Sequence, residues 1–279
     1  MKGLVLLAAL LAAPPAPAGV LWKADFGRQA VWNDGNAEVS SYDARDVLDG
    51  IPRLSRSILV VVAEDLSRTA LVKADRPAGE PATRRVLKLN HVRSIPTGVT
   101  SLQQMLSVFL GVERLDPIKL SMTSHDGCGN SFVEWRSDRG RLWLRSYFEP
   151  VGDRDADLAA GDSIFYDSLP LKLRGLDFVR STEGRVSLID TLFSSNPAPP
   201  SRADARLRVL QVAGSVYRVE LTRGQQTDRF DFESAYPHRM LRWERSDGGV
   251  LTLVDSRRMR YWERNHPGDE RLLPPPAAP

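Results

Sequence analysis

The sequence contains one cysteine and four histidines among 279 residues. A single thiol cannot form an internal disulfide, so packing alone must hold the fold. The histidines lie far apart and share no metal-ligand spacing, so neither a metal site nor a cofactor is predicted. The chain also lacks a glycine-rich phosphate loop, a Gly-x-Ser-x-Gly elbow and a His-Glu-x-x-His motif. These absences lower the expectation of an enzyme without removing it.

Long hydrophobic runs are also absent, except near the start of "MKGLVLLAALLAAPPAPA". Lys2 supplies a positive end, an apolar run follows, and Ala16-Pro17-Ala18 is a small-x-small cleavage site. The apolar run, residues 3–13, is shorter than the roughly twenty residues that a membrane-spanning helix needs. We therefore predict that residues 1–18 are a signal peptide cleaved after Ala18. The protein is then expected to be periplasmic or extracellular, without a transmembrane segment.

The sequence also lacks a large excess of positive or negative charge. The chain has 38 Lys and Arg residues and 35 Asp and Glu residues, a formal net charge of +3. Bases and acids are interspersed, as in "YRVELTRGQQTDRFDFE" (217–233), and form no continuous basic run. A nucleic acid is therefore not expected as a partner.

The clearest positive signal is an alternation of apolar and polar residues that is broken by short turns. In "SVYRVELT" (215–222), Tyr217, Val219 and Leu221 would face one side of a strand. The segments 132–148 and 240–255 each contain two such strands, joined at "SDRG" and "SDGG". Glycine and aspartate supply the backbone angles that tight hairpin turns require. The pattern predicts an all-β protein whose antiparallel sheet has one buried and one wet face.

One segment breaks this alternation. In "DSIFYDSLPLKLRGLDF" (162–178), apolar residues recur at helical spacing, Asp162 could cap a helix and Gly175 could end it. Pro170 favours two short turns over one continuous helix. An apolar helical piece needs a surface to cover, so we expect a strongly curved sheet, a half-barrel, wrapped partly around it. We predict a single domain over residues 19–268 and a disordered Pro- and Ala-rich tail over 269–279.

The cysteine lies in "SMTSHDGCGN" (121–130), in what reads as a tight turn. A nucleophilic thiol needs a neighbouring group that favours the thiolate, and His125 could supply it, with Asp126 orienting the imidazole. These two residues and Cys128 are therefore the catalytic candidates. The alternative is that Cys128 is only a small residue packed between two glycines at a crowded turn.

Ordered blocks of the first half resemble an uncharacterised family of exported bacterial proteins that carries the label "septum formation inhibitor Maf". The blocks are "WNDGNAEVSSYDAR" (32–45), "VKAD" (72–75), "VLKLN" (86–90), "IPTG" (95–98), "MLSVF" (105–109) and "SYFEPVGD" (146–153). The label itself does not fit, because Maf proteins are cytoplasmic nucleotide pyrophosphatases with a Ser-x-Ser-Pro-Arg-Arg motif, which this sequence lacks. The second half, from "YDSLPLKLRGLDF" (166–178), is similar to an exported domain of unknown function with a lipoprotein-carrier-like (LolA-like) fold.

That resemblance implies a curved antiparallel sheet closed by helices over an apolar cavity. The leading interpretation is an exported envelope protein that binds or carries an apolar or amphiphilic ligand, or a protein segment, without catalysis. The inward-facing residues expected to line the cavity are Trp135, Leu142, Leu144, Phe230 and Phe232. Two alternatives stay open: a thiol-dependent envelope enzyme that uses Cys128 with His125, and a structural envelope protein that binds other proteins. The expected partner is thus a lipid, another hydrophobic ligand or an envelope protein.

Overall fold

The fold was obtained as a computed structural model, which describes residues 19–75 and 82–274. Within these residues strands dominate, and the helices are short. The strands are β1 Ala37–Leu48, β2 Ile51–Ser67, β3 Thr83–Pro96, β4 Ser101–Gly111, β5 Pro117–His125, β6 Asn130–Arg136, β7 Arg141–Ser146, β8 Arg154–Asp157, β9 Ile164–Phe165, β10 Glu183–Ile189, β11 Arg202–Ala213, β12 Val216–Arg223, β13 Gln226–Glu233, β14 Met240–Glu244 and β15 Val250–Met259. The helical elements are η1 Phe26–Arg28, η2 Ala30–Asn33, η3 Tyr166–Ser168, α1 Leu169–Lys172, η4 Leu173–Gly175, η5 Tyr261–Glu263 and η6 Asp269–Leu272.

All fifteen strands belong to one sheet, in the order β8-β7-β6-β5-β4-β3-β2-β1-β15-β14-β13-β12-β11-β10-β9. Neighbouring strands are antiparallel except for β9 and β10, which run parallel. The sheet is strongly curved and open, because β8 and β9 are its two edges and do not pair with each other. The predicted fold class, an all-β half-barrel with short helices, is therefore confirmed.

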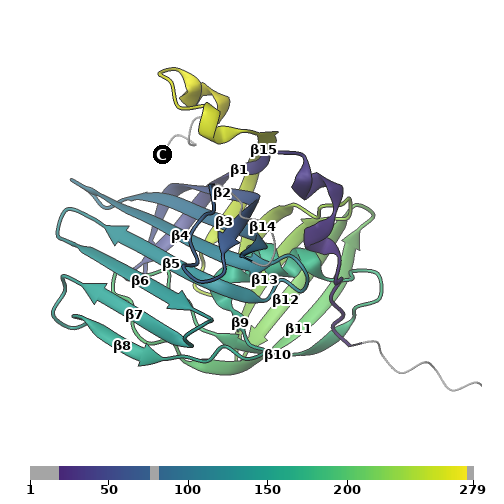
Figure 1. The fold of residues 1–279 in the computed structure, drawn as a ribbon, viewed down its shortest axis with the longest axis horizontal. Coiled ribbons are helices and arrows are strands. Elements are labelled where there is room, and N and C mark those ends of the chain that lie inside the picture. The colour runs from purple at the N-terminus through teal and green to yellow at the C-terminus, as the bar shows by residue number, and fades with distance from the viewer. Residues whose placement is uncertain (1–18, 76–81, 275–279) are drawn as a thin grey trace, which may run out of the picture.

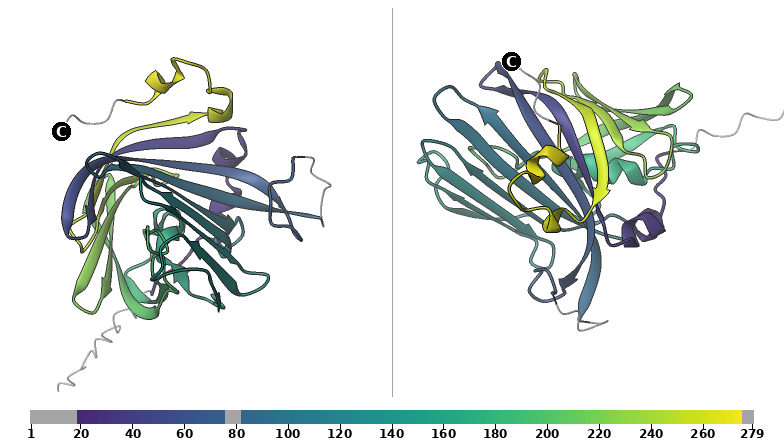
Figure 2. Two further views of the ribbon diagram at one scale, coloured as in Figure 1. Left: turned by 90° about the vertical axis from the view of Figure 1, so that its left-hand side faces the viewer. Right: turned by 90° about the horizontal axis from the view of Figure 1, so that it is seen from above.

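The alternation read from the sequence corresponds to the two faces of this sheet. Along β5 and β6 every second residue is buried, and the hairpins predicted within 132–148 and 240–255 are β6–β7 and β14–β15. Buried side chains of the concave face join the helical run η3-α1-η4 in one large core. Figure 2 shows this run lying inside the curve of the sheet.

The helical run begins later than the sequence suggested. It covers Tyr166 to Gly175 rather than starting after Asp162, because Ile164 and Phe165 first pair as β9 with the end of β10. Pro170 lies in the first turn of α1, where its missing N–H removes no helical hydrogen bond. The predicted division into two short turns becomes three consecutive ones, η3, α1 and η4.

A fully buried ion pair fixes the end of this run to the sheet. Arg174 of η4 donates two hydrogen bonds, of 2.7 and 2.9 Å, to the carboxylate of Glu38 on β1. Its Nε donates to the carbonyl of Pro237, and its guanidinium lies over the ring of Trp32. Both charged side chains are at most 5% exposed. The pair thus holds the helical run, which fills the half-barrel, against the sheet.

The C-terminal segment lies outside the half-barrel. Tyr261 and Leu273 pack on a small apolar cluster on the convex face of β1 and β2, made of Ala37, Val39, Val60 and Val62. Because Leu273 is anchored there, residues 269–272 form η6 where the sequence analysis expected the start of a disordered tail. The rest of that tail, 275–279, and the predicted signal peptide, 1–18, lie outside the described residues. In the described ranges no helix has the length and apolar character needed to cross a bilayer.

We expect Glu38→Ala to lower the free energy of unfolding by about 3–5 kcal/mol, because it leaves Arg174 buried without its counter-charge. Urea unfolding followed by tryptophan fluorescence measures this. Glu183→Ala is the matched control: it removes an equally bidentate pair with Arg206, but both of those side chains are exposed. That change should lower the free energy of unfolding far less, because solvent screens an exposed pair. Equal losses in the two variants would contradict a structural role for the buried pair.

Candidate functional site

A row of polar side chains crosses the concave face of the sheet. Directly opposed residues on adjacent strands share a face, and the register places six polar residues in one line. They are Ser57 on β2, Arg93 on β3, Gln104 on β4, Ser124 on β5, Ser131 on β6 and Ser146 on β7. The neighbouring line on the same face, from Leu106 to Met122, Val133 and Leu144, is apolar apart from His91. We call the six residues the polar row.

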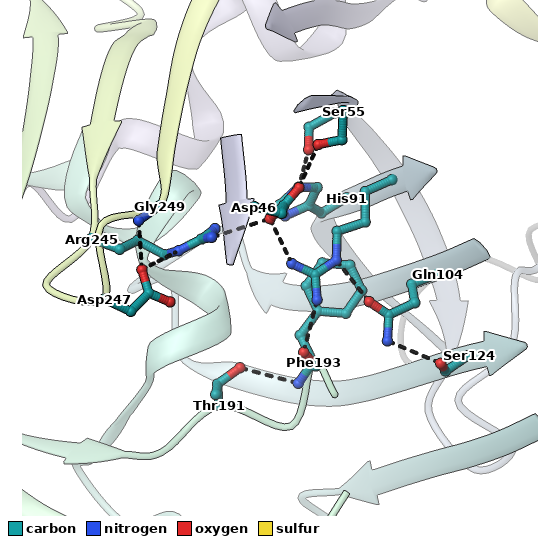
Figure 3. Close-up of polar contacts among 12 residues, drawn as sticks. Asp46, Ser55, His91, Gln104, Ser124, Thr191, Phe193, Arg245, Asp247 and Gly249 are labelled. Carbon is teal, nitrogen blue, oxygen red and sulfur yellow. Dashed lines mark hydrogen bonds and ion pairs between the residues drawn. The ribbon is translucent and has the colours of Figure 1, made fainter. Parts of the chain in front are cut away.

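Arg93 makes the most contacts described for the polar row, and each nitrogen of its guanidinium has an acceptor. Figure 3 shows the residues that supply these acceptors, Asp46, Gln104 and Phe193. The Nη1 of Arg93 donates to Asp46 at 3.1 Å and its Nε to Gln104 at 2.7 Å. Gln104 in turn donates to Ser124 at 2.9 Å. The Nη2 of Arg93 donates to the backbone carbonyl of Phe193 at 3.1 Å, and the guanidinium lies 4.0 Å from the centre of the Phe193 ring. Arg93 is only 9% exposed, so these contacts replace its water shell.

One carboxylate serves two arginines at this site. Asp46 of β1, which is completely buried, also accepts from Arg245 at 3.1 Å and from the Ser55 hydroxyl at 2.6 Å. Burial alone would raise the pKa of Asp46, but the charges of Arg93 and Arg245 overcome that effect and hold it below its ordinary value. Arg245 has a second acid, Asp247, at 3.3 Å. Arg93, by contrast, shares the carboxylate of Asp46 with Arg245, and its Nη2 donates to an uncharged backbone carbonyl.

His91 lies beside this cluster and is uncharged at neutral pH. Burial lowers the pKa of its imidazole to about 3, and the charge of Arg93 acts in the same direction. Its Nε2 is 3.1 Å from the Ser57 hydroxyl, and its ring meets the edge of Phe193. The imidazole therefore borders the site as an uncharged aromatic ring.

The loop after β10 covers the polar row. Its neck is closed by a backbone hydrogen bond of 3.0 Å from Asp190 to Ser201, and we call residues 190–201 the strap. Inside the neck, the carbonyl of Phe193 accepts from Arg93, and the carbonyl of Ser195 accepts from Ser131 at 2.9 Å. The sequence analysis did not assign a role to this loop.

Asp167 of η3 anchors the start of the strap. Its carboxylate accepts from the Thr191 hydroxyl at 2.5 Å and from the Leu192 N–H at 2.7 Å. Burial raises the pKa of Asp167 to about 6, although the two hydrogen bonds and the charge of Arg93 act against this rise. The strap is thus held by a carboxyl group that titrates near neutrality.

A cavity of about 560 Å³ lies over β5, β6 and β7. Its lining includes Ser124, Ser131 and Ser146 of the row, together with Thr123, His125, Asn130, Phe132, Arg145, Tyr147 and Asp153. Thr123, Phe132 and Arg145 oppose one another and alternate with the serines, so the cavity lies on the outer face of these strands and the row does not open into it. A second cavity, of about 690 Å³, lies between the N-terminal segment, the β4–β5 turn and α1. There Lys172 donates to the carbonyls of Arg114 and Leu115 and lies over Trp22, which gives it a structural role.

The three catalytic candidates share one turn but form no catalytic chain. Asp126 accepts from the backbone N–H groups of Cys128 at 2.7 Å and Gly129 at 3.1 Å, so it caps the turn instead of orienting His125. Cys128 is exposed, and His125 lines the 560 Å³ cavity, whereas Cys128 does not. No hydrogen bond joins the two side chains within the described turn. Two glycines are required there because a Cβ on Gly127 would collide with Thr100, and one on Gly129 with Tyr147.

The five residues nominated as ligand-lining all face the concave side, as predicted. All of them are at most 1% exposed, and they pack in the core around the helical run: Trp135, Leu142, Leu144, Phe230 and Phe232. Trp135 also donates its indole N–H to the carbonyl of Leu158 and packs against Phe165. None of the five lines the 560 or the 690 Å³ cavity, because the helical run fills the space that they surround.

The site residues missed in the sequence analysis did leave a signal. In the strands at 83–96, 101–111 and 117–125, alternation predicts apolar residues at the positions of Arg93, Gln104 and Ser124. A polar residue at an inward position in three consecutive strands indicates a buried polar cluster. The register that aligns them was not available from the sequence.

Comparisons with known proteins give little further information. No family model matches the chain, and no curated protein matches it. The chain is similar to one solved structure, described as a beta-barrel-like protein of the domain of unknown function DUF1849 from Brucella abortus. The two share 9% sequence identity with a TM-score of 0.47, and the match covers 81% of this chain and 98% of that one. The resemblances to the Maf-labelled family and to lipoprotein carriers therefore remain predictions.

We expect Asp167→Asn to change how stability depends on pH. The folded-state pKa of Asp167 is raised to about 6, so its stabilisation is present near pH 4 and lost as the pH rises through about 6. The stability difference between wild type and variant should thus be about 2 kcal/mol larger near pH 4 than near pH 7. Urea unfolding at both pH values measures this, with the exposed Asp204→Asn as control. The opposite contribution of His91 is common to both proteins and cancels. A difference that does not vary with pH would contradict the assignment.

We also expect His125→Ala to leave the alkylation of Cys128 by iodoacetamide within about twofold of the wild-type rate near pH 7, because no hydrogen bond joins the two side chains in the described turn. Mass spectrometry of the alkylated protein over time gives the rate. A tenfold slower reaction in the variant would show that His125 activates the thiol.

Proposed function

We propose that this protein is an exported envelope protein that binds a ligand, without catalysis, at the mouth of its half-barrel. The mouth is the end of the half-barrel where the strap lies over the polar row. The observation that carries the proposal is the contact of Arg93 with Phe193: a buried guanidinium whose outward donor is satisfied by a loop carbonyl, not by a fixed counter-charge. A ligand oxygen could take the place of that carbonyl.

The surroundings of Arg93 favour binding over reaction. Gln104, Asp46 and Ser55 hold the guanidinium and its carboxylate in fixed positions, and the neutral His91 offers an apolar ring. The core beneath the row is filled by the helical run, so a ligand would lie along the mouth and not deep in the half-barrel. This arrangement suits a molecule with a hydrogen-bond acceptor and an apolar or aromatic group, such as an amphiphile or a protein segment.

The predicted signal peptide supports the exported location. If it is cleaved after Ala18, the mature protein begins just before the segment that closes the end of the half-barrel opposite the mouth, through the pairing of Trp22 with Leu176. Removal of the signal would then leave this closure intact.

The test is mass spectrometry of the protein purified from its own exported fraction, under native and denaturing conditions. We expect a mass excess that is present only in the native spectrum. Arg93→Gln should lower the occupied fraction at least about tenfold, because it removes a charge-assisted donor. Arg208→Gln, which removes an exposed arginine of β11, is the control and should keep the ligand.

A bare chain in both spectra of the wild-type protein would contradict the proposal, as would full occupancy in Arg93→Gln. Since Arg93 also neutralises Asp46, circular dichroism should first establish that this variant folds. If it does not, Ser131→Ala, which removes a single hydroxyl from the row, replaces it.

A further inference from the structure

The polar row already holds a polypeptide, the strap of the same chain. Two strap carbonyls that are two residues apart, those of Phe193 and Ser195, accept from side chains of the row, Arg93 and Ser131. The two donors lie on different strands, Arg93 on β3 and Ser131 on β6. Side chains that donate to alternate backbone carbonyls recognise a peptide backbone whatever its sequence.

The side-chain contacts of the strap add selectivity. The ring of Phe193 lies on the guanidinium of Arg93 at 4.0 Å and against the imidazole of His91 at 4.9 Å. An aromatic ring on a partly desolvated guanidinium is a favourable cation–π contact. Because His91 is neutral, its ring adds a second aromatic contact to Phe193 without a second positive charge. The row thus has one position for an aromatic side chain and two donors for backbone carbonyls, one for the aromatic residue itself and one for the residue two positions later.

From these contacts we infer that the ligand of this site is a polypeptide segment with an aromatic residue, and that the strap is its intramolecular competitor. The inference rests on the proposed binding function and names its ligand class. The incoming segment places its aromatic ring on Arg93 and its carbonyls where those of Phe193 and Ser195 lie. Only the part of the strap after Leu192 is displaced, because Leu192 stays in the core and the neck is closed separately through Asp190 and Ser201.

The strap weakens binding from solution. A tethered segment competes at a high effective concentration, and the apparent affinity falls by the fraction of molecules whose site is open. Weakening the strap should therefore strengthen the binding of a free peptide. This relation distinguishes a competitor from a loop that is only part of the wall, since damage to a wall would weaken binding.

The experiment uses the acetylated and amidated peptide TLFSSNP, the strap sequence from 191 to 197, carrying a fluorophore. Fluorescence anisotropy gives its affinity for the wild-type protein and for Phe193→Ala. We expect Phe193→Ala to bind it at least about tenfold more tightly than the wild type, because the variant strap no longer places a ring on Arg93. The peptide TLASSNP should bind Phe193→Ala about tenfold more weakly than TLFSSNP, since it brings no ring. Trp262→Ala, which removes an exposed aromatic residue outside the half-barrel, is the control and should behave as the wild type.

The same proteins are titrated with dansyl undecanoic acid, an anionic amphiphile. If this probe binds Phe193→Ala and TLFSSNP does not, the peptide inference is overturned while the proposed binding function stands. If neither probe binds and the native mass of the wild-type protein is that of the bare chain, both are overturned. Should Phe193→Ala fail to fold, Phe193→Leu keeps the apolar bulk without the ring and is subject to the same expectations.

Discussion

A buried guanidinium on the concave face of a strongly curved sheet needs an acceptor at each of its nitrogens, and this requirement organises the mouth of the half-barrel. Arg93 cannot be neutralised by deprotonation, so its surroundings have to supply the acceptors. Asp46 supplies one, but it is shared with Arg245. Gln104 supplies the second and is itself held by Ser124. The third acceptor comes from the strap, so the position of a surface loop depends on one buried charge.

The other end of the half-barrel is governed by a different constraint. A sheet this strongly curved encloses more space than its own side chains fill, and an empty apolar interior would lose packing energy. The run from Tyr166 to Gly175 fills that space, and Arg174 fixes it to Glu38. The two buried arginines therefore differ in one respect. Arg174 has a carboxylate to itself, whereas Arg93 has a shared carboxylate and a replaceable carbonyl.

The sequence was sufficient for the fold class because strand alternation and hairpin turns are local signals. The turns at 137–140 and 245–249 lie where glycine and aspartate indicated them, and the apolar helical piece needed a covering sheet. The start of the helical run could not be predicted, since it depends on the pairing of Ile164 with distant Leu188. The site was missed for the same reason: Asp46, Arg93 and Arg245 are brought together only by the registers of β1 with β2, of β2 with β3 and of β1 with β15. Cys128 attracted notice as a rare residue, but rarity in a sequence carries no information about neighbours in space.

The contacts of the strap decide whether it can leave the row while the fold stays intact. Leu192 is completely buried in the main core and holds the beginning of the strap, and the neck at Asp190 and Ser201 holds both ends. Beyond Leu192, the strap is held by two hydrogen bonds to its carbonyls, by the contacts of the Phe193 ring and by the burial of Pro197. Local opening breaks these contacts and leaves the main core intact, so it costs less than global unfolding. In the opened site the Nη2 of Arg93 no longer donates to the Phe193 carbonyl, and its guanidinium no longer lies on the Phe193 ring. A molecule that offers an oxygen and an aromatic ring there forms the same two interactions. A cover that is held by the same groups that would bind the ligand is, in physical terms, a competitor of that ligand.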